Sequence, residues 1–381
     1  MSDDKEIRAS KVCVVGPVLP YRGGISHYNS MLFRELREMG VQARMFSFSR
    51  QYPRLLYPGA NDRDPSLGEF REPGVEYTID SINPFTWWKT ARNIVLSAPD
   101  LVVFHWWTVF WAPCFIFMAH LLRRRGIRIA LICHNLVDHD AGALKKRISD
   151  QVLNMADAFF VHSSEHKRSL QSTRPGKPVV QHPIPVYGHY PPALHPLPKR
   201  GRLELLFFGF IRPYKGLDVL IEAIRLLDDP EVYLTVIGEY WGDSSVLVKQ
   251  TEACPNIESH LRYMSDGEAA DYFARADFVM LPYRAATGSA VASVAFHYDK
   301  PIIASQTGGL PDVVFEGLTG KLVPPNDAIG LADTLRATDR NQAVSLSAGV
   351  RNFKERNSWQ SLCSTLLTLG QSRLPDTETL A

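Results

Sequence analysis

Short, continuously apolar runs alternate with helical stretches along this chain, and the alternation occurs twice. In the first half the apolar runs fall at residues 11–16, 43–47, 101–104, 129–133 and 158–161. In the second half they fall at residues 203–208, 233–238, 278–282, 301–304 and 320–325. Strands buried on both faces are apolar without alternation, and strands separated by helices form parallel sheets with helices on both sides. We therefore expect an α/β protein with two Rossmann-like, doubly wound domains.

The alternation is interrupted between residues 181 and 200, where six prolines occur. Proline favours extended backbone in itself and in the residue before it, so this segment is predicted to connect the domains. The expected boundaries are an N-terminal domain at 1–195, a second domain at 196–355 and a C-terminal helix at 356–381. That helix is predicted to pack back towards the N-terminal domain, through a stripe of Trp359, Leu362, Leu366 and Leu367.

Composition excludes several classes of protein. The 381 residues are enough for two ordinary domains, and 42 Lys and Arg against 40 Asp and Glu give a net charge of +2. A general nucleic-acid-binding protein would be more basic. The five cysteines are dispersed without a CxxC pair, which is typical of a cytoplasmic protein and not of a disulfide framework or a zinc site. The polar N-terminus does not resemble a signal peptide.

Aromatic residues are dense before residue 123. Residues 105–122 are near the lower length limit for a membrane span, but they contain two histidines and a proline and lie between two strand-like runs. A helix of a βαβ unit is therefore the favoured interpretation. The tryptophan pairs at 87–88 and 106–107 are predicted to be core residues, and contact with a sugar or a lipid is the alternative.

Two cations occupy a short turn between a predicted strand and a predicted helix. Arg212 and Lys215 follow the apolar run at 203–208 and precede the amphipathic segment that starts at Leu217. Ligands of open α/β sheets bind at the carboxyl ends of the strands, and a helix N-terminus favours an anion. The turn therefore predicts a phosphate or diphosphate site, although two solvated loop cations would give the same pattern.

Two glycine-rich turns follow later strands of the same predicted sheet. Residues 286–291 come after the run at 278–282 and residues 307–312 after the run at 301–304. Both place backbone N–H groups and small side chains at the edge expected for Lys215, although ordinary βα turns also favour these residue types. A bound nucleotide diphosphate is therefore expected to contact Thr287, Gly288, Ser289, Ala290, Val291 and Asp312.

A third polar loop follows the predicted strand at 129–133. It contains His134, Asn135, Asp138, His139 and Asp140. Asp138 and Asp140 have the spacing of the DxD motif of metal-dependent sugar transferases, but no other ligand cluster is apparent in the sequence, so no metal is expected. Helix capping is a second interpretation. Substrate contact is the third, with His134 closest to the strand and Asn135, His139 and Asp140 on the acceptor side.

These segments together resemble the family 4 glycosyltransferases, of the kind that build bacterial polysaccharides and glycolipids. The resemblance covers nearly the whole chain and rests on GPVLPYRGGISHY (16–28), SRQYPRLLYPG (49–59), CHNLVDHD (133–140), FFGFIRPYKGLDVLIEA (207–223), GEYWGD (238–243) and the stretch from LPYRAATGS to EGLTGKLVPPND (281–327). It implies the GT-B fold, in which two Rossmann-like domains face a central cleft.

The resemblance also implies a mechanism. A nucleoside-diphosphate sugar would be held mainly by the second domain and a glycan, lipid-linked or small-molecule acceptor mainly by the first. Transfer would retain the anomeric configuration, with no metal and no cofactor. Lys215 and Arg212 match the diphosphate-binding cations of the family, Gly23 and Gly24 its glycine loop near the leaving phosphate, and His134 the histidine beside the reacting sugar.

The sequence departs from the family pattern at two places. Phe210 follows Gly209, where the family has an arginine, and Arg212 is the candidate to supply that charge. Ala286 and Val294 occupy the positions of two glutamates that contact the sugar and the ribose. A non-catalytic nucleotide-binding scaffold and a GT-B-fold nucleotide-sugar epimerase therefore remain alternatives, and the donor sugar is not assigned.

The N-terminal half also contains a basic stretch. Residues 121–170 carry nine Lys and Arg against five Asp and Glu, including the clusters at 123–125 and 145–147. Polybasic segments are attracted to anionic lipid. Peripheral contact with the inner face of the plasma membrane is therefore an expectation, and a solvated basic face is the alternative.

Overall fold

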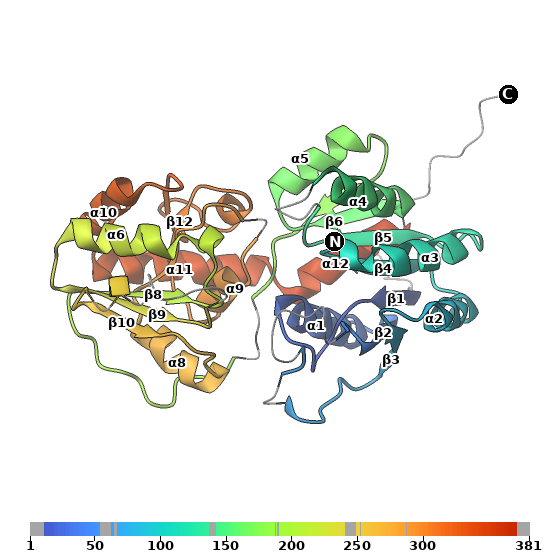
Figure 1. Cartoon of the computed structure of the whole chain (residues 1–381), viewed down its shortest axis with the longest axis horizontal. Helices are drawn as coiled ribbons and strands as arrows, with labels where there is room; N and C mark the ends of the chain where they lie inside the picture. The colour runs from blue at the N-terminus through green and yellow to red at the C-terminus, as the bar shows by residue number, and fades with distance from the viewer. Residues whose placement is uncertain are drawn as a thin grey trace, which may run out of the picture. The chain divides into compact units, whose positions relative to one another are not determined.

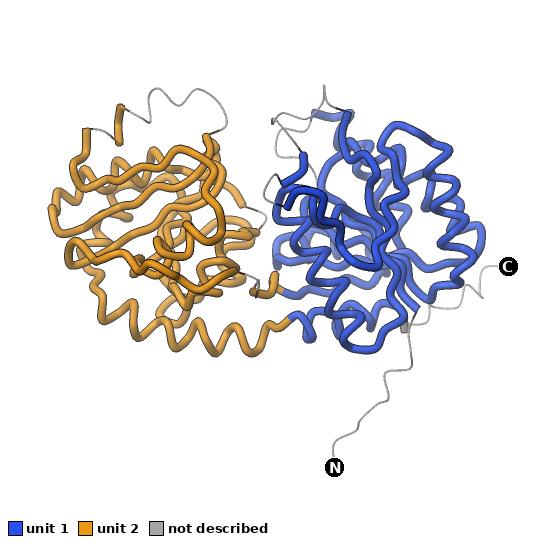
Figure 2. The backbone as a smooth tube through the Cα atoms, turned by 90° about the horizontal axis from the view of Figure 1, so that it is seen from below, with its two compact units in different colours: residues 1–182, 359–381 blue, residues 183–358 orange. Residues whose placement is uncertain are grey.

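The structure is a computed structural model that describes residues 11–53, 62–64, 67–136, 142–186, 188, 190–240, 249–251, 253–286 and 288–371. The chain forms two compact units, one of residues 1–182 and 359–381 (unit 1) and one of residues 183–358 (unit 2), which Figure 2 shows in separate colours. These borders differ from the expected 195/196 and 355/356. The proline-rich segment packs on unit 2, because the Ser293 hydroxyl donates to the carbonyl of Pro185 at 2.6 Å and the Tyr298 hydroxyl to that of Pro191 at 2.9 Å.

Unit 1 contains a seven-stranded sheet in the order β3-β2-β1-β4-β5-β6-β7, and every pairing in it is parallel. Its strands are β1 Lys11–Val15, β2 Gln42–Arg50, β3 Val75–Asp80, β4 Leu101–Trp106, β5 Ile129–Cys133, β6 Ala158–Val161 and β7 Val179–Gln181.

The helices of unit 1 form two layers. They are α1 Gly24–Glu38, α2 Pro84–Ser97, α3 Ala112–Arg123, α4 Ala143–Met155, α5 Ser164–Thr173 and α12 Trp359–Gln371. Helix α1 packs against α12, whereas α2, α3 and α4 form a row in which each contacts the next (Figure 1). The helix expected at the C-terminus is thus part of unit 1, although it is separated from the rest of the unit by all of unit 2.

Unit 2 contains a six-stranded parallel sheet in the order β10-β9-β8-β11-β12-β13. Its strands are β8 Leu203–Phe208, β9 Val232–Ile237, β10 Ile257–His260, β11 Phe278–Leu281, β12 Ile302–Ser305 and β13 Gly320–Val323. Its helices are α6 Leu217–Leu227, α8 Asp266–Arg275, α9 Ala290–His297, α10 Ala328–Arg336 and α11 Arg340–Arg356, with the short 3-10 helices η4 Pro213–Lys215 and η5 Leu310–Asp312.

Strand order reverses once in each sheet. In unit 1 the chain leaves β1 towards β2 and β3 and then returns to β4 on the other side of β1; in unit 2 it leaves β8 towards β9 and β10 and returns to β11. The two crevices are outside the carboxyl ends of β1 and β4, and of β8 and β11. In open α/β sheets ligands bind at such reversal points.

The apolar segments around residue 105 belong to the core of unit 1. Strand β4 continues to Trp106, a 3-10 helix (η3) covers Val109–Trp111, and α3 then starts at Ala112. No helix among the described residues is long and apolar enough to span a bilayer. Trp87 and Trp106 are buried, as expected, but the prediction that Trp88 is a core residue is wrong, because its side chain is 42% exposed on the outer face of α2.

Candidate functional site

The cationic turn of unit 2 lies at the reversal point between β8 and β11. Its backbone is fixed on the β9 side, because Gly209 donates to the carbonyl of Ile237 and Ile211 to that of Glu239, each at 2.9 Å. Lys215 donates its backbone N–H to the carbonyl of Arg212 at 2.9 Å, which closes the 3-10 helix η4. Arg212 and Lys215 therefore belong to one rigid turn at the carboxyl end of β8.

The turn is also tied to the loop after β11. The guanidinium of Arg284 pairs with Asp218 and donates to the carbonyl of Pro213, and the backbone N–H of Arg284 donates to the carbonyl of Tyr214 at 2.7 Å. Gly216 has φ 65°, and a Cβ there would lie 2.1 Å from the carbonyl oxygen of Pro282. Only glycine permits this close approach, so the sequence Lys-Gly is required for the turn to dock on the β11 loop.

Lys215 is a buried cation. Its side chain is 8% exposed, its ammonium lies 5.6 Å from the ring centre of Tyr283, and it is close to Gly209, where a Cβ would be 3.3 Å from the Lys215 Nζ. Burial and the neighbouring Arg212 lower the pKa of Lys215 to about 8, and no ion pair joins Lys215 to a carboxylate of another described residue. An anion placed here would be attracted by both cations and would raise that pKa.

Helix α9 begins at the same edge. Ser289 caps it by accepting the N–H of Ala292, and its hydroxyl lies 3.5 Å from that of the buried Tyr283. Ala290 and Val291 form its first turn. A Cβ added at Gly209 would lie 3.3 Å from the Cγ2 methyl group of Val291 and also 3.3 Å from the Nζ of Lys215. The first turn of α9 therefore adjoins the Lys215 ammonium, which agrees with the expected arrangement of Ser289, Ala290 and Val291.

The glycine turn after β12 is held against the β11 loop. Gly309 donates to the carbonyl of Ala286 at 3.0 Å, and a Cβ at Gly308 would lie 1.5 Å from that same oxygen. Asp312 ends the 3-10 helix η5 that follows. Gly288 is exposed, and a Cβ there would meet only Ile184, at 3.9 Å. Thr287 lies outside the described residues.

Unit 1 has a row of histidines at the corresponding edge. His105 is the second-last residue of β4, and His134, His162 and His182 each follow the last residue of β5, β6 or β7, which are consecutive strands of the sheet. His134 donates its backbone N–H to the carbonyl of Trp106 at 2.9 Å, and Nδ1 of His105 lies 3.0 Å from Nε2 of His134. The two rings are stacked with their centres 5.3 Å apart.

Tyr28 of α1 packs against this row. Its ring centre lies 5.6 Å from that of His105 and 5.2 Å from those of His134 and His162, and on another side 5.1 Å from Trp359. Gly23 caps α1 with φ 109°, a conformation that favours glycine, and Gly24 starts the helix. Tyr28 lies one helical turn after Gly24 and packs against His134. The start of α1 therefore lies at the same edge of the sheet as His134.

His105, His134 and His162 are neutral. Burial lowers the pKa of His105 to about 3 and that of His162 to about 4, and burial together with the neighbouring histidines holds the pKa of His134 well below its usual range. At neutral pH this edge therefore provides directional hydrogen-bonding groups without a net charge.

Hydrogen bonding fixes which nitrogen of His134 carries the proton. Nε2 of His105 is buried and has no hydrogen-bond partner among the described residues. A buried N–H without an acceptor is costly, so the proton of His105 belongs on Nδ1, from which it is donated to Nε2 of His134. The proton of His134 is then on Nδ1, and His134 can donate to a ligand.

The other expected residues of unit 1 are less constrained. The side-chain amide of Asn135 donates to the carbonyl of Trp107 at 3.3 Å, which holds it beside the β4 edge. Asp138, His139 and Asp140 lie outside the described residues. Among the side chains that the structure does describe, no three His, Cys, Asp or Glu residues are grouped closely enough to hold a metal ion.

Sequence reasoning missed His105, His162 and Tyr28 in unit 1, and Tyr283 and Arg284 in unit 2. His162 had a usable signal, because it directly follows the apolar run at 158–161. The role of Arg284 had none, because its partner Asp218 lies 66 residues away in the chain.

Both units of the chain are similar in sequence to known proteins. The family described as Glycosyltransferase Family 4 matches residues 22–186, and the family described as Glycosyl transferases group 1 matches residues 202–339. The GDP-mannose:glycolipid 4-beta-D-mannosyltransferase of Xanthomonas campestris pv. campestris is 24% identical over 277 residues, covering 67% of this chain and 77% of that protein. The D-inositol 3-phosphate glycosyltransferase of Geodermatophilus obscurus is 25% identical over 382 residues, covering 91% and 84%.

Solved structures show the same fold. Anabaena HepE in complex with UDP superposes with a TM-score of 0.70 at 15% identity, covering 95% of this chain and 100% of that one. Sucrose-phosphate synthase from Thermosynechococcus elongatus gives 0.69 at 18% identity, covering 95% and 98%. Two parallel-sheet α/β domains of this kind define the GT-B fold. The chain belongs to family 4 of the glycosyltransferases.

Proposed function

We propose that this enzyme transfers a sugar from a nucleoside-diphosphate sugar to a glycan or lipid-linked acceptor, with retention of the anomeric configuration and without a metal ion. The observation that carries the proposal is the buried Lys215 beside Arg212 at the reversal point of unit 2. A buried ammonium with no carboxylate partner among the described residues is expensive unless an anion joins it. A diphosphate has the charge to do so.

The mechanism consists of positioning and of electrostatic support for the leaving group. Lys215 and Arg212 neutralise the charge that develops on the departing nucleoside diphosphate. The backbone N–H groups around Gly288 and Ser289, at the start of α9, bind the phosphate, and those around Gly23 and Gly24 assist. No side chain is needed as a nucleophile in this scheme.

His134 orients the reacting sugar or the acceptor. As a neutral residue whose Nδ1 carries the proton, it donates a hydrogen bond to a hydroxyl and does not act as a general acid with a positive charge. Asn135, His139 and Asp140 are the further residues proposed on the acceptor side.

Asp312 is proposed to replace part of what the missing glutamates would contribute. Ala286 and Val294 are both buried, so neither position can present a group to a sugar hydroxyl. Asp312 follows Gly309, whose N–H donates to the carbonyl of Ala286. This hydrogen bond keeps the loop that contains Asp312 beside the start of α9. A carboxylate there would accept charge-assisted hydrogen bonds from donor hydroxyls.

The relatives do not agree on a donor nucleotide. The Xanthomonas protein is named for GDP-mannose and a glycolipid, and HepE was solved with UDP and with UDP-glucose. We leave the base and the sugar open and propose an acceptor of the glycan or glycolipid class, in polysaccharide or glycolipid synthesis at the cytoplasmic face of the membrane.

The deciding experiment is a thermal-shift screen against UDP, GDP and ADP and their sugars, followed by assays of transfer and of slow hydrolysis with each binder. A ligand that binds the folded state raises its apparent stability. Gly288→Val is the diagnostic variant, because a Cβ at this exposed position meets only Ile184, at 3.9 Å, while the added side chain would block the backbone approach to a phosphate. It should unfold like the wild type and lose donor binding.

Three outcomes separate the candidates. Transfer that persists in excess EDTA, with an unchanged anomeric configuration by NMR, supports the proposal. If EDTA abolishes activity and magnesium or manganese restores it, the proposed metal independence is wrong, and Asp138 and Asp140 become the candidate metal ligands. Nucleotide binding without transfer or hydrolysis across the whole panel would favour the scaffold, which the loss of both glutamates makes the second candidate.

A further inference from the structure

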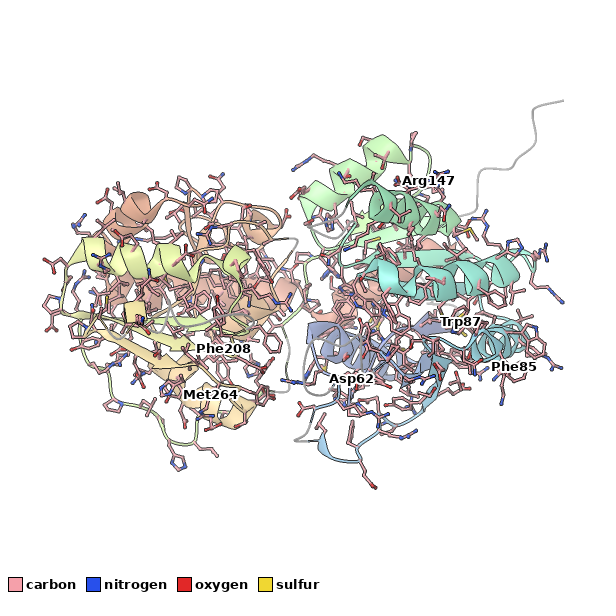
Figure 3. The ribbon with its side chains drawn as sticks, in the orientation of Figure 1. Asp62, Phe85, Trp87, Arg147, Phe208 and Met264 are labelled. Atoms are coloured by element: carbon pink, nitrogen blue, oxygen red, sulfur yellow. The ribbon has the colours of Figure 1, made fainter. Side chains whose placement is uncertain are left out.

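The outer face of α2 carries exposed apolar and basic side chains in one stripe. Trp87, Thr90, Ala91 and Ile94 form the buried face of the helix. The opposite face consists of Phe85, Trp88, Lys89, Arg92 and Leu96, which are all exposed and spaced three or four residues apart along the helix, with Lys89 beside Trp88. Figure 3 shows Phe85 on the outer side of α2 and Trp87 towards the rest of the unit.

The aromatic residues of this stripe are held in place. The rings of Phe85 and Trp88 stack with their centres 5.8 Å apart, and the guanidinium of Arg92 lies 5.7 Å from the ring of Trp88. Phe85 is nevertheless 66% exposed, and Ile82, just before the helix, is 54% exposed. A stacked aromatic pair beside a cation is thus presented to solvent. We call Ile82, Phe85, Trp88, Lys89 and Arg92 the α2 surface.

Acidic residues are absent from α2 and α3, although Asp80 accepts a hydrogen bond from the backbone of Ile82 and Asp157 pairs with Arg123. Residues 84–97 and 112–125, which contain α2 and its neighbour α3, include no Asp or Glu. They include five cations, Lys89, Arg92, Arg123, Arg124 and Arg125. Phe117 of α3, whose ring lies 6.0 Å from that of Trp87, is partly exposed and extends the apolar area.

We propose that the α2 surface docks on an anionic lipid bilayer, with Phe85 and Trp88 in the headgroup region and Lys89 and Arg92 against lipid phosphates. Interfacial helices have this combination of an apolar aromatic stripe and flanking cations, and tryptophan favours the boundary between lipid and water. The inference rests on the proposed function in one respect: a lipid-linked acceptor would be reached from such a surface.

The charge of the α2 surface favours an anionic bilayer over a second copy of this chain and over a nucleic acid. In a two-fold contact between copies of this chain the same helix faces itself, so Lys89 and Arg92 would meet the cations of the second copy without a compensating acid. A nucleic acid would require a more extensive basic field than a chain of net charge +2 provides. An anionic bilayer satisfies the aromatic and the basic side chains together.

The inference assigns membrane contact to α2 and not to the basic cluster of α4. Lys145, Lys146 and Arg147 are also exposed, but no aromatic residue accompanies them on that helix. Phe85 and Arg147 lie at the two ends of the row formed by α2, α3 and α4 (Figure 3). Variants of the two helices therefore test different surfaces.

The test uses the full chain and vesicles of phosphatidylcholine with or without phosphatidylglycerol. Co-sedimentation and the blue shift of tryptophan fluorescence measure binding. Phe85→Ser with Trp88→Ser, and separately Lys89→Glu with Arg92→Glu, should each weaken binding to the anionic vesicles about tenfold or more. The charge variant should also remove the preference for phosphatidylglycerol.

Two controls match these variants. Ile329→Ser with Val344→Ser removes two exposed apolar side chains from unit 2, and Lys145→Glu with Lys146→Glu reverses two charges on α4. Both should bind vesicles within about twofold of the wild type, because neither touches the α2 surface. All variants should keep the nucleoside diphosphate binding of the wild type, which is measured without vesicles.

Any of three results would overturn the inference: a wild-type protein that ignores anionic vesicles, α2 variants that bind them as the wild type does, or loss of binding in the α4 control alone. A dimer by light scattering that the Phe85→Ser and Trp88→Ser changes dissociate, without vesicle binding, would assign the surface to a second copy instead. Intact diphosphate binding in these cases would leave the proposed function standing.

Discussion

The two sheets bury basic side chains at equivalent edges, but at neutral pH those of unit 2 are charged and those of unit 1 are neutral. In unit 2 the pKa of Lys215 is about 8, so its ammonium stays charged, and Arg212 adds a second cation. In unit 1 the pKa values of His105 and His162 are about 3 and about 4, so the imidazoles are neutral. One edge thus offers charge to a ligand and the other offers hydrogen bonds with a fixed direction.

The difference follows from the choice of residue type. Burial lowers the pKa of any base, because it removes the charged form from water. A lysine starts near 10.5 and remains protonated at pH 7 after a large downward shift, whereas a histidine starts near 6.5 and loses its charge. The same physical effect therefore leaves a buried cation in unit 2 and uncharged imidazoles in unit 1.

The largest expected effect is an acid instability confined to unit 1. The pKa of His162 is lower in the folded protein than in the unfolded chain, so stability is complete above pH 6.5 and is lost as the pH falls towards 4, because the unfolded chain takes up protons that the fold excludes. The loss from His162 alone is about 3 kcal/mol. Hydrogen exchange resolved by mass spectrometry should show unit 1 opening before unit 2 in this range.

His162→Leu provides the matched test of the acid prediction. Its unit 1 should lose stability less steeply between pH 6.5 and 4 than that of the wild type. If both units open together in the wild type, and the His162→Leu variant shows the same pH dependence, the buried neutral histidines do not determine the acid stability of unit 1.

Removing the cation of unit 2 should separate the two edges functionally. Lys215→Ala should weaken nucleoside diphosphate binding roughly 10- to 150-fold, which corresponds to the loss of a charge-assisted contact of about 1.5–3 kcal/mol. His134→Ala should leave the affinity for the diphosphate alone within about twofold, since it contributes no charge. Calorimetric titration of both variants measures this, and equal losses in the two would contradict the division of roles.

A third prediction concerns the pH dependence of binding. Diphosphate binding needs the protonated form of Lys215, so affinity should be nearly constant up to about pH 7, be roughly halved at pH 8 and be about tenfold lower at pH 9 if the bound state keeps its proton. Lys215→Met cannot titrate and should bind weakly with a flat profile. A wild-type profile that is flat up to pH 9.5 would show that Lys215 is not the group that holds the phosphate.

The smallest expected effect concerns the tautomer of His134. His105→Leu removes the proposed donor to Nε2 of His134, whereas His105→Asn can keep an N–H near that position. The leucine variant should lower kcat roughly fivefold, in line with about 1 kcal/mol for one hydrogen bond, with the diphosphate affinity unchanged, and the asparagine variant should recover most of the loss. Nitrogen NMR of the wild type should show Nδ1 of His134 protonated; a protonated Nε2 would contradict the assignment.

The sequence predicted every central strand, but of the four edge strands it predicted only β13. No apolar run in the sequence predicted β3, β7 or β10, and each of these strands lies at an edge of its sheet. β3 (VEYTID) and β10 (IESH) are only partly buried and carry charged residues, and β7 has three residues. An edge strand needs only one neighbour and little burial, so its sequence lacks the signal on which the prediction depends.

The candidate site was predictable to the extent that its residues lie next to strands. His134 directly follows β5, and Arg212, Lys215 and Ser289 lie in the loops that follow β8 and β11. Parallel strands bring those ends to one edge of each sheet. His105 was not predictable in the same way, because it lies within an apolar segment and resembles a core residue. Trp88 had the opposite problem: a tryptophan in a helix predicts burial, and its exposure depends on which face of α2 meets the sheet.

Unit 2 is a single stretch of chain, whereas unit 1 is completed only by α12. During synthesis the whole of unit 2 has therefore emerged before the helix that closes unit 1, and domains tend to fold as units as they appear. Trp359 is the first residue of α12 and packs on the ring of Tyr28, which in turn touches three of the histidines. Unit 1 is thus completed last, by residues that the ribosome adds after unit 2 is finished.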